Sequence, residues 1–209
     1  MLPGMTIQNA TVYDMVSRTF ERNKMYLRYF LYLMGDWLVT IIGLILAPIL
    51  PLFATSEARL PKWLSWFDTH DNTLDGDDGW KNEHLLFLNC KGDSLDFIRI
   101  YLKRVCWLLR NTGYGFSHKV AGVHVASDDV VSWEGNQKVG NRPLSEGKCS
   151  ALLRGDNKAF MLYYVKKTFK GRCLRIYIGW KLKNKVDHPE WGGTEMIVCS
   201  INQFMSFSE

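Results

Sequence analysis

One long apolar stretch dominates the pattern of hydrophobic and polar positions. Tyr29 to Ala54 contains a single charged residue, Asp36, close to its start. A helix of about 20 apolar residues crosses a hydrocarbon core of roughly 30 Å, so this stretch is long enough to do so. The alternative is a buried core helix of a soluble protein, but such helices carry a polar stripe, which is absent from Trp37 to Leu46. We therefore predict a membrane segment.

Two prolines influence how this segment meets the bilayer. Pro48 and Pro51 each remove a backbone donor, so a straight helix should stop or kink near Ala47. One geometry is a helix that crosses the bilayer, which the pattern favours, and the other is a helix, a break and a short return within one leaflet. The side chains predicted in the membrane or at its surface are Trp37, Ile41, Ile42, Leu44, Leu46, Pro48, Pro51, Trp63 and Trp66.

The rest of the pattern predicts helices first and strands afterwards. Arg59 to Phe67 places Leu60, Trp63, Leu64 and Phe67 on one face of a short helix, and Leu95 to Leu109 has an apolar stripe at helical spacing. Period-two alternation then takes over, beginning with short strands at Val120 to Ala126 and Val130 to Trp133. The fold class is therefore α+β, with an N-terminal membrane helix, one or two soluble helices and an antiparallel sheet. We divide the chain into 1–28 (polar), 29–54 (membrane), 55–80 (interfacial helix and acidic loop) and 81–209 (soluble domain).

The clearest β unit is a hairpin near the C-terminus. Phe160 to Phe169 and Arg172 to Leu182 flank a turn at Lys170-Gly171, and Met196 to Phe204 predicts a further strand. In the second hairpin strand an apolar face alternates with a face that carries basic residues. The residues predicted to attract an anionic surface are Lys166, Lys167, Lys170, Arg175 and Lys181. Anionic lipid is the expected partner; nucleic acid is a weaker alternative because few aromatic side chains share this face.

A short segment after the apolar stretch is strongly acidic. Residues 68–80 place five aspartates in a loop that also contains glycines. Such oxygen ligands suit Ca²⁺ or Mg²⁺, although the EF-hand spacing is absent. The candidate metal ligands are Asp71, Asp75, Asp77 and Asp78. The alternative, which we favour, is a structural loop whose side chains bond to nearby backbone amides and cap the next helix, with no cofactor.

Composition and charge set broad limits. The 209 residues carry a net charge of +5 and are 47% hydrophobic, which is typical of a folded chain and not of a disordered one. The five cysteines form no CxxC pair, which favours reduced thiols and a cytoplasmic location. Basic residues before the apolar stretch place the N-terminus in the cytoplasm, so a single crossing would export the cysteines. A return within one leaflet would keep both ends in the cytoplasm.

Four segments carry a resemblance to a known family. They are Arg59 to Phe67, Asp71 to Trp80, Trp107 to Phe116 and Arg175 to Leu182. The chain resembles an uncharacterised family of short proteins encoded by tailed bacteriophages and prophages. The resemblance implies a phage origin and a common fold, but no activity. His70 and Thr112 stand where such relatives often have proline, which makes His70 a poor candidate ligand.

Three functions follow as hypotheses. The first, which we favour, is a non-enzymatic, membrane-anchored phage accessory protein of the host inner membrane that acts on the host envelope or on a protein partner. The second is a component of the virion that helps to deliver the genome. The third is a hydrolase dependent on a divalent metal in the acidic loop, although the sequence contains no nucleophile motif or phosphate-binding glycine loop. Oligomerisation is compatible with each.

Overall fold

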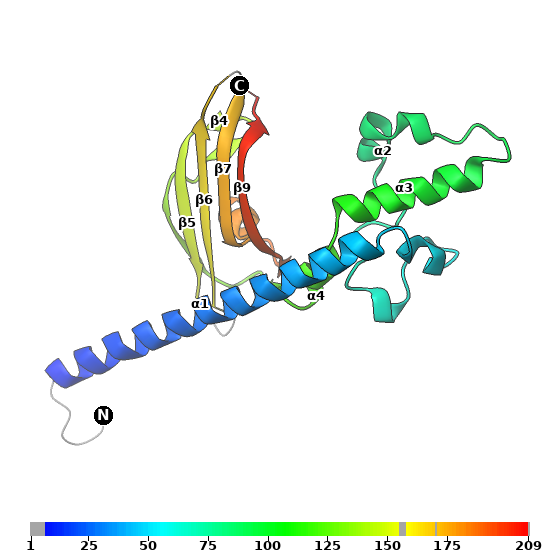
Figure 1. Cartoon of the computed structure of the whole chain (residues 1–209). Helices are drawn as coiled ribbons and strands as arrows, with labels where there is room; N and C mark the ends of the chain where they lie inside the picture. Colours follow the sequence, from blue (N-terminus) through cyan, green and yellow to red (C-terminus); the bar gives the residue numbers. More distant parts are fainter. Residues whose placement is uncertain (1–6, 155–157, 170, 209) are drawn as a thin grey trace.

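The computed structural model describes residues 7–154, 158–169 and 171–208. It has the predicted α+β fold, in which one long helix joins a sheet to a group of shorter helices (Figure 1). The helices are α1 (Ile7–Leu46), η1 (Leu50–Phe53), η2 (Lys62–Leu64), α2 (Asp78–His84), η3 (Leu86–Leu88), α3 (Asp96–Arg110), α4 (Tyr114–Lys119) and α5 (Lys183–Asp187). The strands are β1 (Val123–Val125), β2 (Val131–Gly135), β3 (Gly140–Asn141), β4 (Leu144–Ser145), β5 (Gly147–Leu153), β6 (Ala159–Lys167), β7 (Arg172–Trp180), β8 (Gly193–Glu195) and β9 (Ile197–Ser206).

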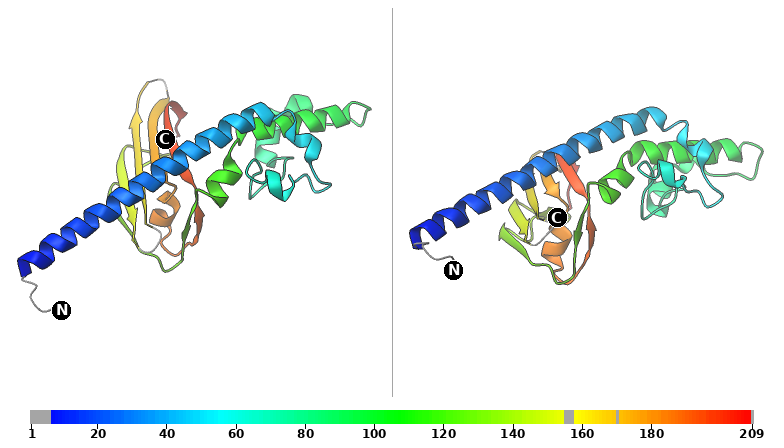
Figure 2. Two further views of the ribbon diagram at one scale, coloured as in Figure 1. Left: turned by 60° about the horizontal axis from the view of Figure 1, so that its bottom comes forward. Right: turned by 90° about the horizontal axis from the view of Figure 1, so that it is seen from below.

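Helix α1 contains 40 residues and so extends for about 60 Å. The predicted polar segment 1–28 is therefore continuous with the apolar segment over the residues described. The helix ends at Leu46, immediately before the predicted proline break, and the chain turns through η1. Figure 2 shows the middle of α1 passing across the sheet and its C-terminal end lying beside α3.

The sheet has five antiparallel strands in the order β2-β5-β6-β7-β9. The predicted hairpin is confirmed, since Lys167 of β6 pairs with Cys173 of β7 and Met161 pairs with Gly179. The last predicted strand is also confirmed, because β9 pairs with β7 along most of its length. Two short ribbons, β1-β8 and β3-β4, complete the β structure of the described residues.

Two apolar cores divide the molecule. The sheet half consists of the sheet, its ribbons, α4, α5 and the part of α1 before residue 40, and its core includes Trp180, Met161 and Tyr29. The helical half consists of residues 40–112, and its core is smaller, with Leu50, Leu74 and Trp107 buried. Helix α3, which the sequence analysis grouped with the soluble domain 81–209, contacts the acidic loop through Arg104 and Arg110.

The predicted burial of two elements also needs correction. The expected helix from Arg59 to Phe67 is only the single turn η2, and Trp63 points away from the buried Leu64 with 71% of its surface exposed. In β7 the two faces do not separate into core and solvent. Cys173, on the predicted polar face, is fully buried, whereas Ile176 on the predicted core face is half-buried. Residues on both faces of this inner strand are buried or half-buried, so polarity alone does not identify the inner face.

Candidate membrane-facing surface

Helix α1 has one buried face and one exposed face, and both are apolar. Its buried residues Met25, Tyr29, Leu33 and Val39 recur every four to six positions and face the sheet half. The opposite side, which we call the outer face of α1, has large apolar side chains that are 38–70% exposed. These are Tyr26, Leu27, Phe30, Leu31, Met34, Trp37, Leu38, Ile41, Ile42, Leu44 and Ile45.

By length and composition, Glu21–Leu46 could cross a membrane. Core helices of soluble proteins and signal sequences meet the same criteria. Only 22% of its most apolar window is buried. A core helix of a soluble protein would be mostly buried, so the outer face needs an apolar cover that the described residues do not supply.

The inner face of α1 is fixed to the sheet by aromatic and polar contacts. The ring of Tyr29 lies 5.0 Å from that of Phe160 and 5.4 Å from that of Trp180, and its hydroxyl donates to Val198 O at 2.9 Å. The guanidinium of Arg28 donates to Lys158 O. Protein therefore occupies one side of the middle of this helix, and lipid cannot surround it there.

Asp36, the charged residue of the apolar stretch, lies on the protein side of α1. The hydroxyl of Ser117 in α4 donates to its carboxylate. Gly113 makes this approach possible: a Cβ at this position would lie 2.6 Å from Thr40 Oγ1, and its φ of +75° suits glycine. The carboxylate is therefore directed away from the outer face, which remains uncharged.

Helix α3 leaves its predicted apolar stripe uncovered. Leu95, Ile98, Leu102 and Leu109 are 39–51% exposed, and Phe97 beside them is 71% exposed. The basic residues of α3, in contrast, are held within the helical half. Arg99 pairs with Asp93 at 2.7 Å, and Arg104 and Arg110 contact two aspartates of the acidic loop. This amphipathic helix therefore presents apolar groups outward while much of its positive charge is neutralised.

The other residues predicted at the membrane are mostly exposed. Trp37, Ile41, Ile42 and Leu44 belong to the outer face of α1, whereas Leu46 is half-buried and Pro51 is buried. Pro48 is exposed, and its carbonyl accepts from the Tyr101 hydroxyl. Trp63 and Trp66 are 71% and 49% exposed, and their rings contact those of Phe53 and Phe116, respectively. Six of these nine residues thus lie on surfaces that also expose other aromatic or aliphatic side chains.

The acidic loop is held by basic residues and by backbone groups. Asp75 accepts from Arg104 at 2.7 Å, Asp78 pairs with Lys81 at 2.8 Å, and Asp71 accepts from the Tyr114 hydroxyl at 3.2 Å. Asp77 caps α2 by accepting from Trp80 N at 2.7 Å, as the structural interpretation of the loop predicts. The four candidate ligands are therefore directed toward different partners. Within the described residues, no three histidine, cysteine or acidic side chains are grouped so that they could hold a metal ion.

Arg59 organises this loop, which the sequence did not reveal. Its guanidinium donates to Thr69 O at 2.6 Å and to Asn72 O, and lies 3.8 Å from the carboxylate of Asp68. That carboxylate is buried and also accepts from Leu60 N at 3.3 Å. Burial raises the pKa of Asp68, and the hydrogen bond from Leu60 and the charge of Arg59 oppose this effect.

The predicted basic surface of the hairpin is not continuous. Lys166 and Lys167 are exposed, but Arg175 is half-buried beside Tyr163. Lys181 is half-buried as well, with its ammonium 6.0 Å from the centre of the Tyr114 ring, and burial lowers its pKa. Lys170 lies outside the described residues. Arg175 and Lys181 are thus poorly placed to contact a lipid surface together with the other lysines.

Comparison with protein families identifies residues 21–209 with DUF7338, a family of unknown function. The chain belongs to this family. No curated protein and no solved structure matches it. Membership of DUF7338 supports the recognition of an uncharacterised family and assigns no activity to the chain.

Proposed function

We propose that this member of DUF7338 is a membrane-attached accessory protein that lies on one leaflet through the outer face of α1. The uncovered apolar side of that helix carries the proposal. Burial of a half-exposed large apolar side chain is worth about 1 kcal/mol, so the eleven residues of the outer face offer on the order of 10 kcal/mol. Attachment of this kind needs no positive charge.

An orientation along the membrane surface agrees better with the geometry than a crossing. Lipid would surround a helix that crosses the bilayer alone, whereas Tyr29 and Arg28 of α1 bind the sheet half. That half has Lys158 next to α1, paired with Glu21 at 2.8 Å. The break after Leu46 also turns the chain back beside α1. Both ends would then stay in the cytoplasm, which reconciles the reduced cysteines with the basic residues before the apolar stretch.

The biological setting is inferred from the sequence. The resemblance to proteins of tailed bacteriophages and prophages supports a role during infection, at the cytoplasmic face of the host inner membrane. A non-enzymatic role on the host envelope or on a protein partner agrees with an acidic loop whose carboxylates are engaged in structural contacts. Mass spectrometry of purified particles would distinguish this role from that of a virion component, because an accessory protein should be absent from the particle.

Liposome flotation of the full chain tests attachment. The wild type should float at low and at high salt, and Ile41→Asp/Ile45→Asp should remain at the bottom of the gradient. These two side chains are 56% and 70% exposed on α1. The matched control, Ile201→Asp/Phe204→Asp, replaces side chains that are 69% and 58% exposed on β9, and it should float. Flotation of both variants, or of neither, would refute attachment through α1.

The orientation has a separate test. Reporters fused to the two ends of the chain should be accessible from the same side of the membrane. Reporters on opposite sides would show that α1 crosses the bilayer. Attachment would then stand, and the proposed orientation would be wrong.

A further inference from the structure

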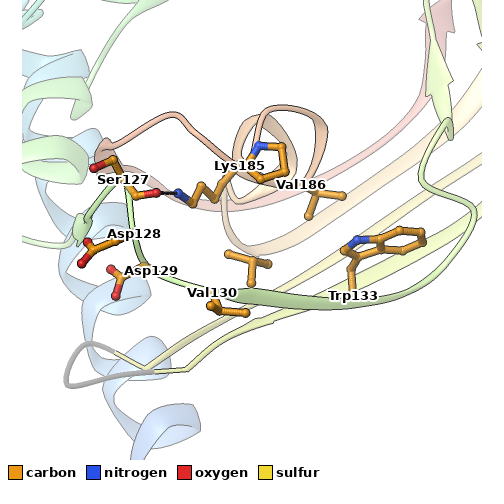
Figure 3. A pocket seen from close by; sticks show the side chains of 9 residues that line it. Ser127, Asp128, Asp129, Val130, Trp133, Lys185 and Val186 are labelled. Carbon is orange, nitrogen blue, oxygen red and sulfur yellow. Dashed lines mark hydrogen bonds between the residues drawn. The ribbon is translucent and has the colours of Figure 1, made fainter.

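A pocket in the sheet half contains a buried cation without a counterion. The pocket has a volume of about 280 Å³ and lies between α5 and the edge strand β2 (Figure 3). Its lining is mixed: Val130, Val131, Trp133, Val186 and Pro189 are apolar, and Ser127, Asp128, Asp129 and Lys185 are polar or charged. This site is distant in sequence from the outer face of α1 and is independent of the membrane proposal.

Lys185 is the unusual residue of the pocket. It is only 3% exposed, and its ammonium donates to Ala126 O at 3.1 Å and to Ser127 O at 2.9 Å. An ammonium has three N–H donors, so these two bonds leave one for a further acceptor. Within the part of the chain that is described, no carboxylate lies within ion-pair distance of it. Because buried charges in proteins are normally paired, a negatively charged oxygen is a suitable partner for the remaining N–H.

The apolar lining residues indicate the chemistry of the part of a ligand that would not contact Lys185. Val186 is buried, while Val130 and Trp133 are 68% and 43% exposed although they are large apolar side chains beside the pocket. Figure 3 shows Val186 beside α5, Val130 at the start of the strand and Trp133 farther along it, away from Ser127. A short branched or aromatic body fits such a surface.

The acidic residues at the border of the pocket do not prevent an anionic group from binding to Lys185. Asp129 accepts from Ala126 N at 2.8 Å, and Asp128 is exposed. In Figure 3 both carboxylates lie on the outer side of the loop. Solvent screens an exposed charge strongly, whereas contact with a buried ammonium is screened little.

We propose that this pocket binds a carboxylate with a small apolar body, whose oxygen accepts the remaining N–H of Lys185. Two sources share this chemistry: a free short-chain acid, and the C-terminal carboxylate of a peptide that ends in an apolar residue.

Ligand-observed NMR on the full chain in a nonionic detergent tests the proposal with two matched pairs of probes. The first pair is 3-methylbutanoate and 3-methylbutylamine, which have the same apolar body and opposite charges. The second pair is acetyl-Gly-Gly-Val with a free or an amidated C-terminus. The carboxylates should bind and their partners should not. Tighter binding of the free-acid peptide than of 3-methylbutanoate would identify a chain terminus as the ligand, and the reverse order would identify a free acid.

Variants distinguish a binding site from a structural lysine. Lys185→Met should weaken carboxylate binding about tenfold or more, the loss expected for a hydrogen bond to a charged group. Trp133→Ala should also weaken it, and Asp128→Asn should leave it unchanged or strengthen it slightly. If Lys185→Met does not fold, Trp133→Ala still tests whether binding depends on the pocket. The amine and amide probes still test whether it depends on the carboxylate. Equal binding of acid and amine, or unchanged binding in folded Lys185→Met, would overturn the proposal.

Discussion

The two halves that α1 joins are stabilised in different ways. The sheet half buries large side chains, and Trp180 is fully inaccessible with its indole N–H donating to Ala121 O at 2.9 Å. The helical half has a smaller core and many polar contacts, such as those of Arg59 and Arg104 with the acidic loop. At the same time it exposes Phe87 and Phe97 at 72% and 71%.

This difference indicates where the apolar residues of the helical half are used. A region that exposes large apolar groups while its charges bind one another is suited to an apolar environment outside the chain. Polar contacts then supply stability that a larger apolar core would supply elsewhere. The exposed apolar side chains can contact an apolar environment outside the chain. In the sheet half, the outer face of α1 exposes apolar side chains in the same way, whereas the sheet encloses a core of its own. The following predictions test this contrast.

The largest effect is expected in the sheet core. Trp180→Ala should lower the free energy of unfolding by about 3–5 kcal/mol, because it creates a cavity among the rings of Tyr29 and Phe160. Urea unfolding followed by circular dichroism in nonionic detergent measures this. Trp191→Ala is the control: Trp191 is 53% exposed, so its loss should cost less than 1 kcal/mol. Equal effects would mean that the sheet half does not depend on its core.

Local patterns in the sequence predicted individual elements well. The limits of α3 agree within one residue, and the helix end at Leu46 follows from the prolines. These signals act through neighbouring residues, so they are readable without tertiary structure. The hairpin was predictable for the same reason. Its register is determined by a short turn and by alternation on both strands.

Contacts between distant residues were not predictable. The bonds of Arg59 to backbone carbonyls of residues 69 and 72 leave no pattern in the sequence. The sidedness of α1 was hidden because both of its faces are apolar. The burial of Lys185 was not predictable either, because it depends on the distant loop whose Ser127 carbonyl accepts from its ammonium.

A second effect should be confined to the helical half. Arg59→Met retains an aliphatic stem of similar length but removes the donors to Thr69 O and Asn72 O. It also leaves the carboxylate of Asp68 buried without its cation. We expect a loss of about 2–3 kcal/mol. Hydrogen exchange should accelerate at residues 58–75, while β6 and β7 remain protected. Lys62→Met, which replaces an exposed lysine nearby, is the control. Exchange that accelerates in the sheet as well would contradict the independence of the halves.

Acid should loosen the start of α3 while the sheet stays intact. The Arg99 side chain lowers the pKa of Asp93, and the Lys91 amide lowers that of Asp96. A carboxyl with a lowered pKa stabilises the folded state above its unfolded pKa, near 3.8, and this contribution is lost as the pH falls through the folded value. The amide resonances of Lys91 and Gly92, which donate to Asp96, should therefore shift with a midpoint below pH 3.8. Asp96→Asn should abolish this transition, and a midpoint above that pH would contradict the prediction.

Calcium should have little effect on the acidic loop. Asp75→Ala removes an ion pair in which the aspartate side chain is 49% exposed, so we expect a loss of at most about 1 kcal/mol, with or without chelator. The melting temperature of the wild type should not change between chelator and millimolar calcium. An increase of several degrees that is lost in Asp75→Ala would instead establish a metal site in this loop.

The smallest effect on stability is expected where the sequence pattern alone would predict a large one. Ile98 and Leu102 belong to the apolar stripe of α3, and both are 39% exposed. If the stripe packed in a core, Ile98→Ser/Leu102→Ser would cost several kcal/mol; on an uncovered surface we expect about 1 kcal/mol or less. The same variant should float less efficiently with liposomes, since it removes apolar area from the helical half but leaves the outer face of α1 intact. Unchanged stability with unchanged flotation would show that lipid contacts α1 alone, and a large loss of stability would show that α3 packs against protein.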